Sequence, residues 1–316
     1  MRHLTTTLIL TLLTLTIQAQ DITPVLYKVT GNGAKPSYIF GTCHTVDISF
    51  FDSIPGATKA LSKVKKVMLE INQDTTGLKA MMSNDPNDPI IMMPADTTYE
   101  QLMSQADIHF MDSIFGQYAQ QLYTRKPFGL ATGLQFVKMA KRNQKIFTIP
   151  PSERRMDHGI DILADSMGLN RGFFETLKEQ SELVKSIGEL TFKAPLPTQA
   201  QVLHKTITAF DDTTSVTLND IWQLSTMQYK AMCIRQETLI EAATMSEIKD
   251  LYTPEQKQYI TDLMLKDRNL RWLPTIETEI KQQPTFIAVG FAHVIGPNNI
   301  VDLLRAKGYK VKPITK

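Results

Sequence analysis

The chain contains the same short pattern twice, once near each end, and this repetition constrains its fold more than any other feature. In YIFGTCH an apolar run ends at Gly41 and a histidine, His44, follows three positions later. In FIAVGFAH the run ends at Gly290, and His293 follows at the same spacing. Each pattern indicates a buried strand that ends at a glycine, where the backbone can turn tightly or approach another group closely. Two distant parts of the chain are therefore predicted to form the same structural unit.

The residues around each pattern complete a unit of strand, GxxH turn, helix and second strand. At the N-terminal end the first strand belongs to a hairpin around the turn at residues 31–33. The expected elements of the two units are, in chain order, strands 25–30 and 37–40, a helix in 54–64, a strand in 65–72, strand 286–289, a helix over 299–307 and strand 310–314.

The long region between the two units shows mostly helical spacing and little strand character. Its expected helices lie within 99–115, 131–141, 160–167, 173–187, 217–243 and 254–283. We interpret residues of about 75–283 as a helical insertion that caps a small mixed sheet made mainly by the two ends. The predicted fold class is therefore α/β, with one domain over residues 21–316.

Residues 1–20 have the layout of a secretory signal peptide. A short basic start precedes an apolar stretch over 4–17, and small or polar residues follow around Ala19. A membrane anchor is the alternative, but the apolar stretch is short for a span and no other apolar run approaches that length. We therefore expect export to the periplasm or the outside, with no transmembrane segment in the mature chain.

Charge and cysteine content narrow the functional classes. The net charge of +2 argues against a nucleic-acid partner, because neutralising phosphates requires many clustered Lys and Arg side chains. Cys43 and Cys233 are too few for a disulfide scaffold. Two readings of them stay open: they pair in an oxidising compartment, or Cys43 is a free thiol packed under the first histidine. The oligomeric state is not indicated.

Three side chains are candidates for one shared site. His44 and His293 follow strands at the carboxyl edge of the predicted sheet, where ligand crevices form in α/β proteins. Glu70 lies in the otherwise apolar strand VMLEI, and burying a carboxylate costs on the order of several kcal/mol unless a cation, metal or donor compensates. Two imidazoles and a carboxylate are a common ligand set for a divalent metal, which could activate water and polarise a carbonyl.

Two alternatives compete with a metal site. The first is an ion pair between Glu70 and Arg268 of LKDRNLRW; both can hold at once if Arg268 lies behind the metal ligands or stabilises an oxyanion. The second is a polar cluster that only locks the two sheet halves together. GxSxG, Walker, GxGxxG and HExxH signatures are absent, so other common hydrolase and nucleotide-binding classes are disfavoured.

This ordered set of motifs resembles the TraB/GumN family, which includes the Tiki proteins of animals, over nearly the whole mature chain. YIFGTCH and IAVGFAHVIG are similar to the two GxxH motifs of the family, and VMLE is similar to its strand-borne glutamate, here Glu70. DRNLRW resembles the family's ERNxxW and brings in Arg268 and Asn269.

The middle of the chain carries the resemblance further, with some departures. It keeps Asp157 and the ETLKEQ sequence that begins at Glu175, which is similar to LETxxEQ. Thr42 and Cys43 replace the usual small residues before the first histidine, and Asp267 replaces the glutamate of ERN. The first departure places a thiol beside the site and could alter metal preference.

The resemblance implies an α/β core with a helical insertion, related to the erythromycin-esterase and ChaN-like fold. For the Tiki branch it implies a metal-dependent peptidase that uses both GxxH histidines and the glutamate. We therefore expect an exported metal-dependent hydrolase, a Tiki-like metallopeptidase acting on a peptide or protein. The alternative is a non-catalytic binding protein that sequesters a peptide, metal or haem-like ligand in the same crevice.

The expected site residues follow from that reading. His44, Glu70 and His293 would be catalytic and would bind a divalent ion of Mn, Co or Zn, and Gly41 and Gly290 would form the turns. Arg268 is the fourth catalytic candidate, through charge stabilisation. The residues expected to orient substrate or support the ligands are Asp157, Glu175, Asn269 and Cys43.

Overall fold

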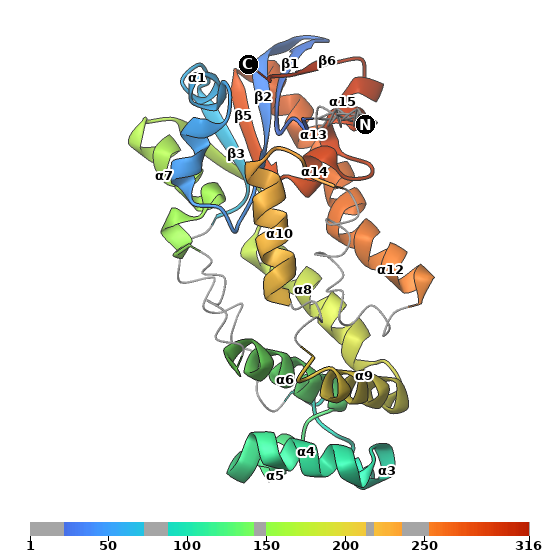
Figure 1. Ribbon diagram of the computed structural model, residues 1–316. Coiled ribbons are helices and arrows are strands. Elements are labelled where there is room, and N and C mark those ends of the chain that lie inside the picture. The colour runs from blue at the N-terminus through green and yellow to red at the C-terminus, as the bar shows by residue number, and fades with distance from the viewer. Residues whose placement is uncertain (1–21, 73–87, 142–149, 213–217, 236–252, 316) are drawn as a thin grey trace, which may run out of the picture.

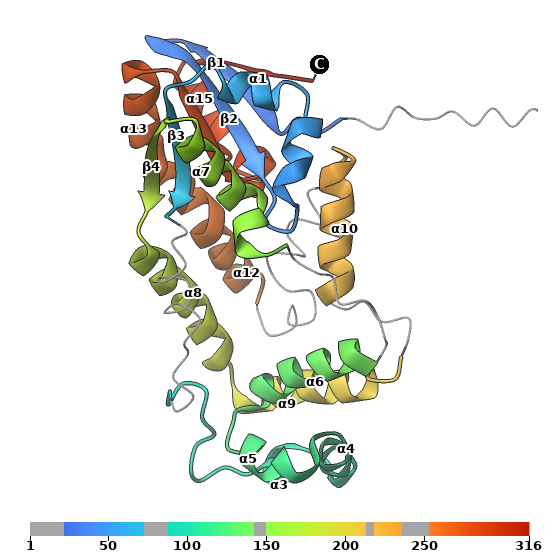
Figure 2. The ribbon, with the colours of Figure 1, turned by 90° about the vertical axis from the view of Figure 1, so that its left-hand side faces the viewer.

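A mixed six-stranded sheet flanked by helices forms one half of the molecule, and a group of helices beyond one edge of the sheet forms the other (Figures 1 and 2). The computed structural model describes residues 22–72, 88–141, 150–212, 218–235 and 253–315. The expected signal peptide and the end of the predicted helix 217–243 lie outside these residues. The mixed sheet with surrounding helices confirms the α/β prediction.

The strands of the two chain ends are interleaved in the sheet, in the order β4-β3-β5-β2-β1-β6. The strands β2, β5, β3 and β4 are parallel neighbours, and β1 is antiparallel to both β2 and β6. C-terminal β5 thus lies between the N-terminal strands β2 and β3. The strands are β1 (Leu26–Gly31), β2 (Ala34–Thr42), β3 (Lys66–Ile71), β4 (Asn170–Glu175), β5 (Thr285–Gly290) and β6 (Lys310–Pro313).

The helices divide between the sheet and the cap. Those near the sheet are α1 (Ala57–Leu61), α7 (Met156–Ser166), α12 (Pro254–Thr261), α13 (Asp267–Gln282), α14 (Ala292–Ile295) and α15 (Ile300–Ala306). Those of the cap are α3 (Tyr99–Leu102), α4 (Gln105–Phe115), α5 (Ala119–Leu122), α6 (Pro127–Lys141) and α9 (Leu196–Thr208). Between the two halves run α8 (Leu177–Phe192) and α10 (Leu218–Lys230) (Figures 1 and 2).

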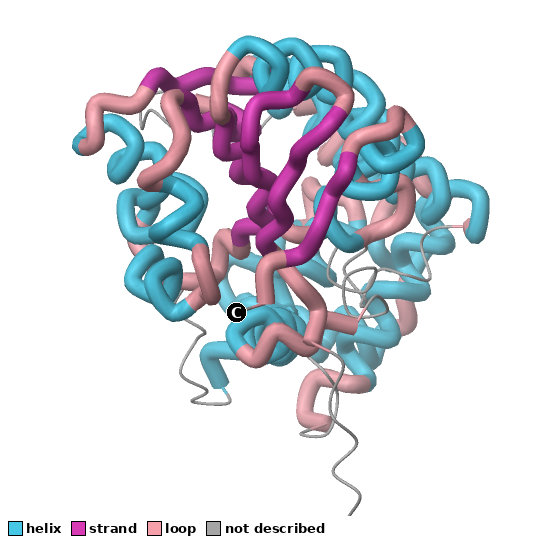
Figure 3. Tube along the Cα trace, turned by 90° about the horizontal axis from the view of Figure 1, so that it is seen from above, coloured by secondary structure: helices cyan, strands magenta, loops and turns pink. Residues whose placement is uncertain are grey.

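Helices cover both faces of the sheet (Figure 3), and a buried apolar core lies on each face. Successive side chains of a strand point to opposite faces, so Phe286 and Ala288 join the core that includes α1 and α7. Ile287 and Val289 join the core on the other face, which includes α13 and α15. Burial on both faces explains why the central strands are continuous apolar runs rather than alternating ones.

The strand β4 corrects the sequence analysis, which predicted a helix from residue 173. Residues 170–175 instead pair in parallel with β3, with Phe173 opposite Leu69. Phe173 packs toward one core and Phe174 toward the other, where it stacks on Trp272 with ring centroids 5.2 Å apart. The helix starts only after Thr176, whose side chain accepts from the backbone of Glu179 in a capping box.

The cap has a core of its own, in which Met111, Leu130, Leu134 and Leu203 are fully buried. The predicted helix 99–115 is broken in two, because Ser104 caps the start of α4. The helix α9 was not predicted. The interpreted insertion also contains β4, α7 and α13, which belong to the layers of the sheet rather than to the cap. Among the described residues no helix has the length and apolar character that crossing a membrane requires.

Candidate functional site

The four parallel strands end at one edge of the sheet, and each ends beside a residue that the sequence analysis singled out. His44 follows β2 and His293 follows β5, while Glu70 and Glu175 lie at the ends of β3 and β4. Thr42 of β2 pairs with Gly290 of β5, so the two GxxH turns begin side by side. The fold thus brings residues more than 200 positions apart to a common edge.

Gly41 and Gly290 are needed because other groups pack closely against their backbone, and neither adopts a positive φ angle. A Cβ on Gly41 would lie 2.8 Å from the Cα of Phe291, so a side chain there would push the two turns apart. A Cβ on Gly290 would lie 3.2 Å from Oε1 of Glu70, and the Gly290 N–H donates to that oxygen at 2.6 Å. The glycines therefore let the turns and the carboxylate of Glu70 pack together.

Glu70 and Arg268 form the centre of a buried ionic network. Nη2 of Arg268 donates to Oε2 of Glu70 at 2.6 Å, and the Glu70 side chain is 12% exposed. Burial alone would raise the pKa of Glu70, but the neighbouring Arg268, followed by His293 and His44, lowers it to about 2. Glu70 is therefore ionised at neutral pH.

Glu175 holds Arg268 from the other side. Nε and Nη2 of Arg268 each donate to Glu175 at 3.0 Å, and the carboxylate also accepts from Arg271 and, at 3.1 Å, from the indole N–H of Trp272. The Glu175 side chain is 1% exposed, so its charge must be neutralised within the protein. Arg268 is thus fixed between two carboxylates, and Glu175 acts on the site through it.

His293 is buried in the same network as a neutral imidazole. Its Nδ1 lies 2.7 Å from Oδ1 of Asn269, and its Nε2 lies 3.0 Å from Nη1 of Arg268. Asn269 donates its amide to the carbonyl of Asn298, so its oxygen faces the histidine and accepts. Burial first, and then the nearby positive charge, lowers the pKa of His293 to about 4. Nδ1 therefore carries the proton, and Nε2 accepts from Arg268.

His44 has the opposite environment. Its side chain is 58% exposed, and Nδ1 lies 3.0 Å from Oδ2 of Asp157 on α7. The negative charge of Asp157, with a smaller contribution from Glu70, raises the pKa of His44 to about 9 against the effect of desolvation. His44 is therefore an imidazolium at neutral pH, with Nδ1 held by Asp157.

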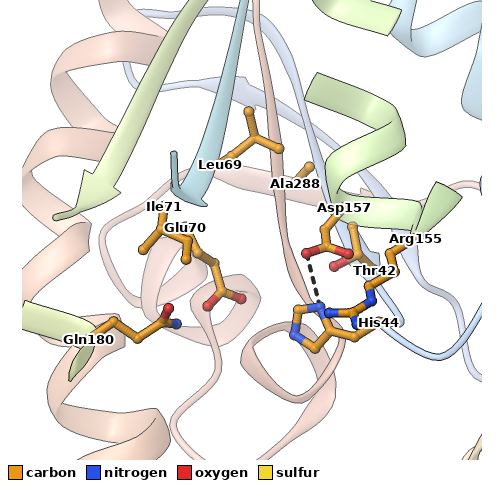
Figure 4. A pocket seen from close by; sticks show the side chains of 9 residues that line it. All are labelled: Thr42, His44, Leu69, Glu70, Ile71, Arg155, Asp157, Gln180 and Ala288. Atoms are coloured by element: carbon orange, nitrogen blue, oxygen red, sulfur yellow. Dashed lines mark ion pairs between the residues drawn. The ribbon is translucent and has the colours of Figure 1, made fainter. Parts of the chain in front are cut away.

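These groups border a pocket with a volume of about 180 Å³. Figure 4 shows His44, Asp157 and Arg155 on one side, Glu70 in the middle and Gln180 on the other side. Thr42, Leu69, Ile71 and Ala288 complete the lining. The sequence analysis assigned no role to Arg155, Gln180 or Thr42, although Gln180 lies within the quoted ETLKEQ and Thr42 within YIFGTCH. His293 and Arg268 are not lining residues and support Glu70 from behind.

Cys43 is packed under the first turn rather than in the pocket. Its thiol is buried and lies 3.2 Å from the hydroxyl of Thr45. Burial raises the pKa of Cys43, so the group is a neutral thiol. Within the described residues neither Cys43 nor Cys233 forms a disulfide, which favours the reading of an unpaired thiol beside the site.

The side chains of His44, Glu70 and His293 are of the kinds that bind a divalent ion, but Arg268 already occupies part of the same space. A Cβ placed on Gly290 would lie 3.8 Å from Cδ2 of His293 and 3.9 Å from Nε2 of His44, so the three expected ligands border one small space. As they stand, however, no three His, Cys, Asp or Glu side chains in the described ranges form a group that could hold an ion. Arg268 occupies the lone pair of His293 Nε2 and one oxygen of Glu70. An ion would therefore compete with Arg268.

Comparison with known proteins identifies one family. Residues 25–313 match the family model described as TraB/PrgY/gumN, which spans nearly the whole chain. Neither curated proteins nor solved structures give a match to the chain.

Proposed function

The chain belongs to the TraB/PrgY/gumN family, and from this premise we propose that it is a hydrolase whose reaction takes place in the pocket between His44 and Glu70, with a peptide or protein as the substrate. The observation that carries the proposal is the pairing, in one open pocket, of a cationic imidazole and a carboxylate that is kept ionised. Groups tuned apart in pKa within a cleft are typical of active sites.

The side chains of the pocket suit acid catalysis. In the metal-free pocket His44 carries its second proton at Nε2, because Asp157 holds Nδ1, and in that state Nε2 can donate to the leaving group of a scissile bond. The same Nε2 is the atom that would bind a metal, so His44 serves either as the acid or as a ligand, not as both at once. Asp157 fixes the ring and keeps it protonated. Glu70 is committed to Gly290 and Arg268 through both oxygens, so it places negative charge at a fixed point of the pocket rather than exchanging protons.

We propose a divalent metal ion as the cofactor. His44, Glu70 and His293 would hold it, and when bound it would lower the pKa of a water molecule and polarise a substrate carbonyl. His44 would have to lose its proton and His293 its contact with Arg268, so affinity should rise with pH. The network of Arg268 and Glu175 would then stand behind the ligands and keep Glu70 oriented.

Export is part of the same proposal, since residues 1–20 have the layout of a signal peptide. Expression of the full chain in a bacterium, followed by N-terminal sequencing of the protein from the periplasm or the medium, should give a mature start at Gln20 or Asp21. Recovery of intact chain with Met1 from the cytoplasm alone would contradict it.

The function is tested on the mature chain from Asp21. Metal content after dialysis and cleavage of a broad peptide library, with and without Mn²⁺ or Co²⁺, are measured for wild type and for His44→Ala, Glu70→Gln and His293→Ala. His109→Ala, on the exposed surface of the cap, is the matched histidine control. The proposal expects about one bound ion and cleavage in wild type and the control, with loss of both in the three site variants.

Two other outcomes would replace the proposal. If wild type binds peptides or a metal but cleaves nothing, the pocket belongs to a binding protein. If it does neither, and the site variants only unfold earlier than the His109 control, the cluster locks the sheet together and has no chemistry.

A further inference from the structure

Arg155 is a cation in the pocket that has no acidic partner among the described residues. It precedes α7, its side chain is half-buried, and Figure 4 shows its guanidinium next to His44. Its Nε donates to the carbonyl of Pro150 at 3.3 Å. In the described part of the chain no carboxylate forms an ion pair with Arg155, whereas its neighbour Arg154 makes two hydrogen bonds to Asp47, at 2.7 and 3.0 Å.

The other charges of the pocket are already balanced. Glu70 is paired with Arg268, and Asp157 is paired with His44. The positive charge of Arg155 is therefore left over, beside a histidine that is itself cationic. A half-buried guanidinium with unused donors is well suited to bind an oxyanion, because its N–H groups match the two oxygens of a carboxylate.

Two further polar groups in the pocket wall have no partner within the described residues. The hydroxyl of Thr42 is buried and makes no hydrogen bond. Gln180 reaches into the pocket from α8, and no hydrogen bond of its amide is found among the described residues (Figure 4). Buried polar groups normally find partners, so the unpaired hydroxyl of Thr42 points to a ligand that supplies one, and the half-buried amide of Gln180 can bind the same ligand. The wall thus offers a cation on one side and a neutral amide on the other.

We infer that Arg155 is a specificity-determining residue that binds a carboxylate of the substrate next to the scissile bond. This inference rests on the proposed function and deepens it by naming the substrate class. Because Arg155 lies beside His44, the carboxylate would sit within about one residue of the bond that His44 serves. It would come either from the C-terminus of a peptide or from an Asp or Glu side chain adjacent to the cleaved bond.

Three matched sets of N-acetylated peptide mixtures distinguish these sources. The first set has a free C-terminal carboxylate, the second has the same sequences with a C-terminal amide, and the third is amidated but contains Glu at each position in turn. Cleavage is followed by mass spectrometry, and binding by calorimetry. Wild type is expected to prefer a carboxylate-bearing set over the plain amides by about 10–100-fold in kcat/KM or Kd, as expected for charge-assisted hydrogen bonds.

The variants Arg155→Gln and Arg155→Lys test the residue itself. Arg155→Gln should lose the preference, because KM or Kd for the carboxylate peptides rises about 10-fold or more above any change for the amide peptides. Arg155→Lys should retain part of the preference, and Arg154→Gln should retain all of it. The ratio between carboxylate and amide peptides separates lost recognition from a misfolded site, because a general structural defect would affect all three sets alike and leave the ratio as in wild type.

The outcomes separate this inference from the proposed function. If no peptide is cleaved but wild type binds carboxylate peptides and Arg155→Gln does not, the hydrolase proposal fails and the inference holds. If wild type treats acids and amides alike, binds neither, or keeps the preference in Arg155→Gln, the inference is overturned, even where cleavage is observed.

Discussion

The two GxxH turns have the same sequence pattern and the same position at the edge of the sheet, yet their histidines have opposite environments. The side chain of His44 is 58% exposed and its pKa is raised to about 9, whereas that of His293 is 4% exposed and its pKa is lowered to about 4. The motif therefore determines where each histidine lies, but not its charge.

The difference comes from the helices that pack against each turn. The helix α7 brings Asp157 to His44, and a carboxylate stabilises the imidazolium. The helix α13 brings Asn269 and Arg268 to His293, and these fix a neutral ring whose Nε2 accepts. The first turn therefore places a protonated histidine, His44, in the pocket. The second turn places a neutral histidine, His293, in the hydrogen-bond network that holds Arg268 and Glu70.

The largest effect on stability is expected from removing the buried cation Arg268, which lies behind the second turn. Arg268→Met would leave Glu70 without its main partner and Glu175 with Arg271 and the indole N–H of Trp272, and unpairing a buried charge costs about 3–5 kcal/mol. Urea denaturation should show a loss of that size in the free energy of unfolding. Lys178→Met, which removes an exposed pair with Glu182, is the control and should cost less than about 1 kcal/mol. Equal losses in both variants would mean that the network is not structurally important.

A smaller effect is expected from Asn269→Ala. This change would leave the Nδ1–H of His293 and the carbonyl of Asn298 without their buried partner, at a cost of about 2–3 kcal/mol. The same denaturation assay measures it. The NMR signals of the His293 ring should also shift, because the Asn269 oxygen that keeps the proton on Nδ1 is removed. Unchanged stability with unchanged ring signals would show that Asn269 does not orient the histidine.

The close contact between the turns is tested by Gly41→Ala. The added methyl would lie 2.8 Å from the Cα of Phe291, and the required shift is expected to cost about 1–2 kcal/mol. Gly188→Ala is the matched control, because in the described part of the chain no atom outside its own helix backbone would lie within 4 Å of the added Cβ, and the residue is inside α8. That control should be neutral or stabilising by about 0.5–1 kcal/mol. A neutral Gly41→Ala would show that the turns can separate freely.

The smallest effect on stability is expected from Asp157→Asn. The variant should lower the pKa of His44 from about 9 toward 6.5, while Asp161→Asn, one turn along α7, should leave it unchanged. Because the folded-state pKa of His44 is raised, its pairing stabilises the fold fully below pH 6.5, and this contribution is lost as the pH rises through 9. Exposure limits it to less than about 1 kcal/mol. A His44 titration that does not respond to Asp157→Asn would exclude Asp157 as the cause.

The sequence predicts the features that depend on local pattern. The apolar runs that end at Gly41 and Gly290 locate β2, β5 and both histidines, and an isolated glutamate in an apolar strand locates Glu70. The contact between Glu70 and Arg268 was one of the alternatives considered, because a buried carboxylate requires a partner.

Features that depend on packing were missed. Phe173 and Phe174 fit a helix or a strand, and the pairing of β4 with β3 decides between them. Arg155 and Gln180 enter the pocket because α7 and α8 place them there, and no local pattern reports this. The two histidine charges depend on Asp157 and Asn269, which reach the turns through helices distant in sequence.

The most direct test of the comparison is the NMR titration of the two GxxH histidines in the metal-free protein, with assignments from His44→Gln and His293→Gln. We expect His44 to titrate near pH 9 and His293 to stay neutral down to about pH 4. Two titrations close to 6.5 would contradict this expectation, because the two turns would then share one electrostatic environment.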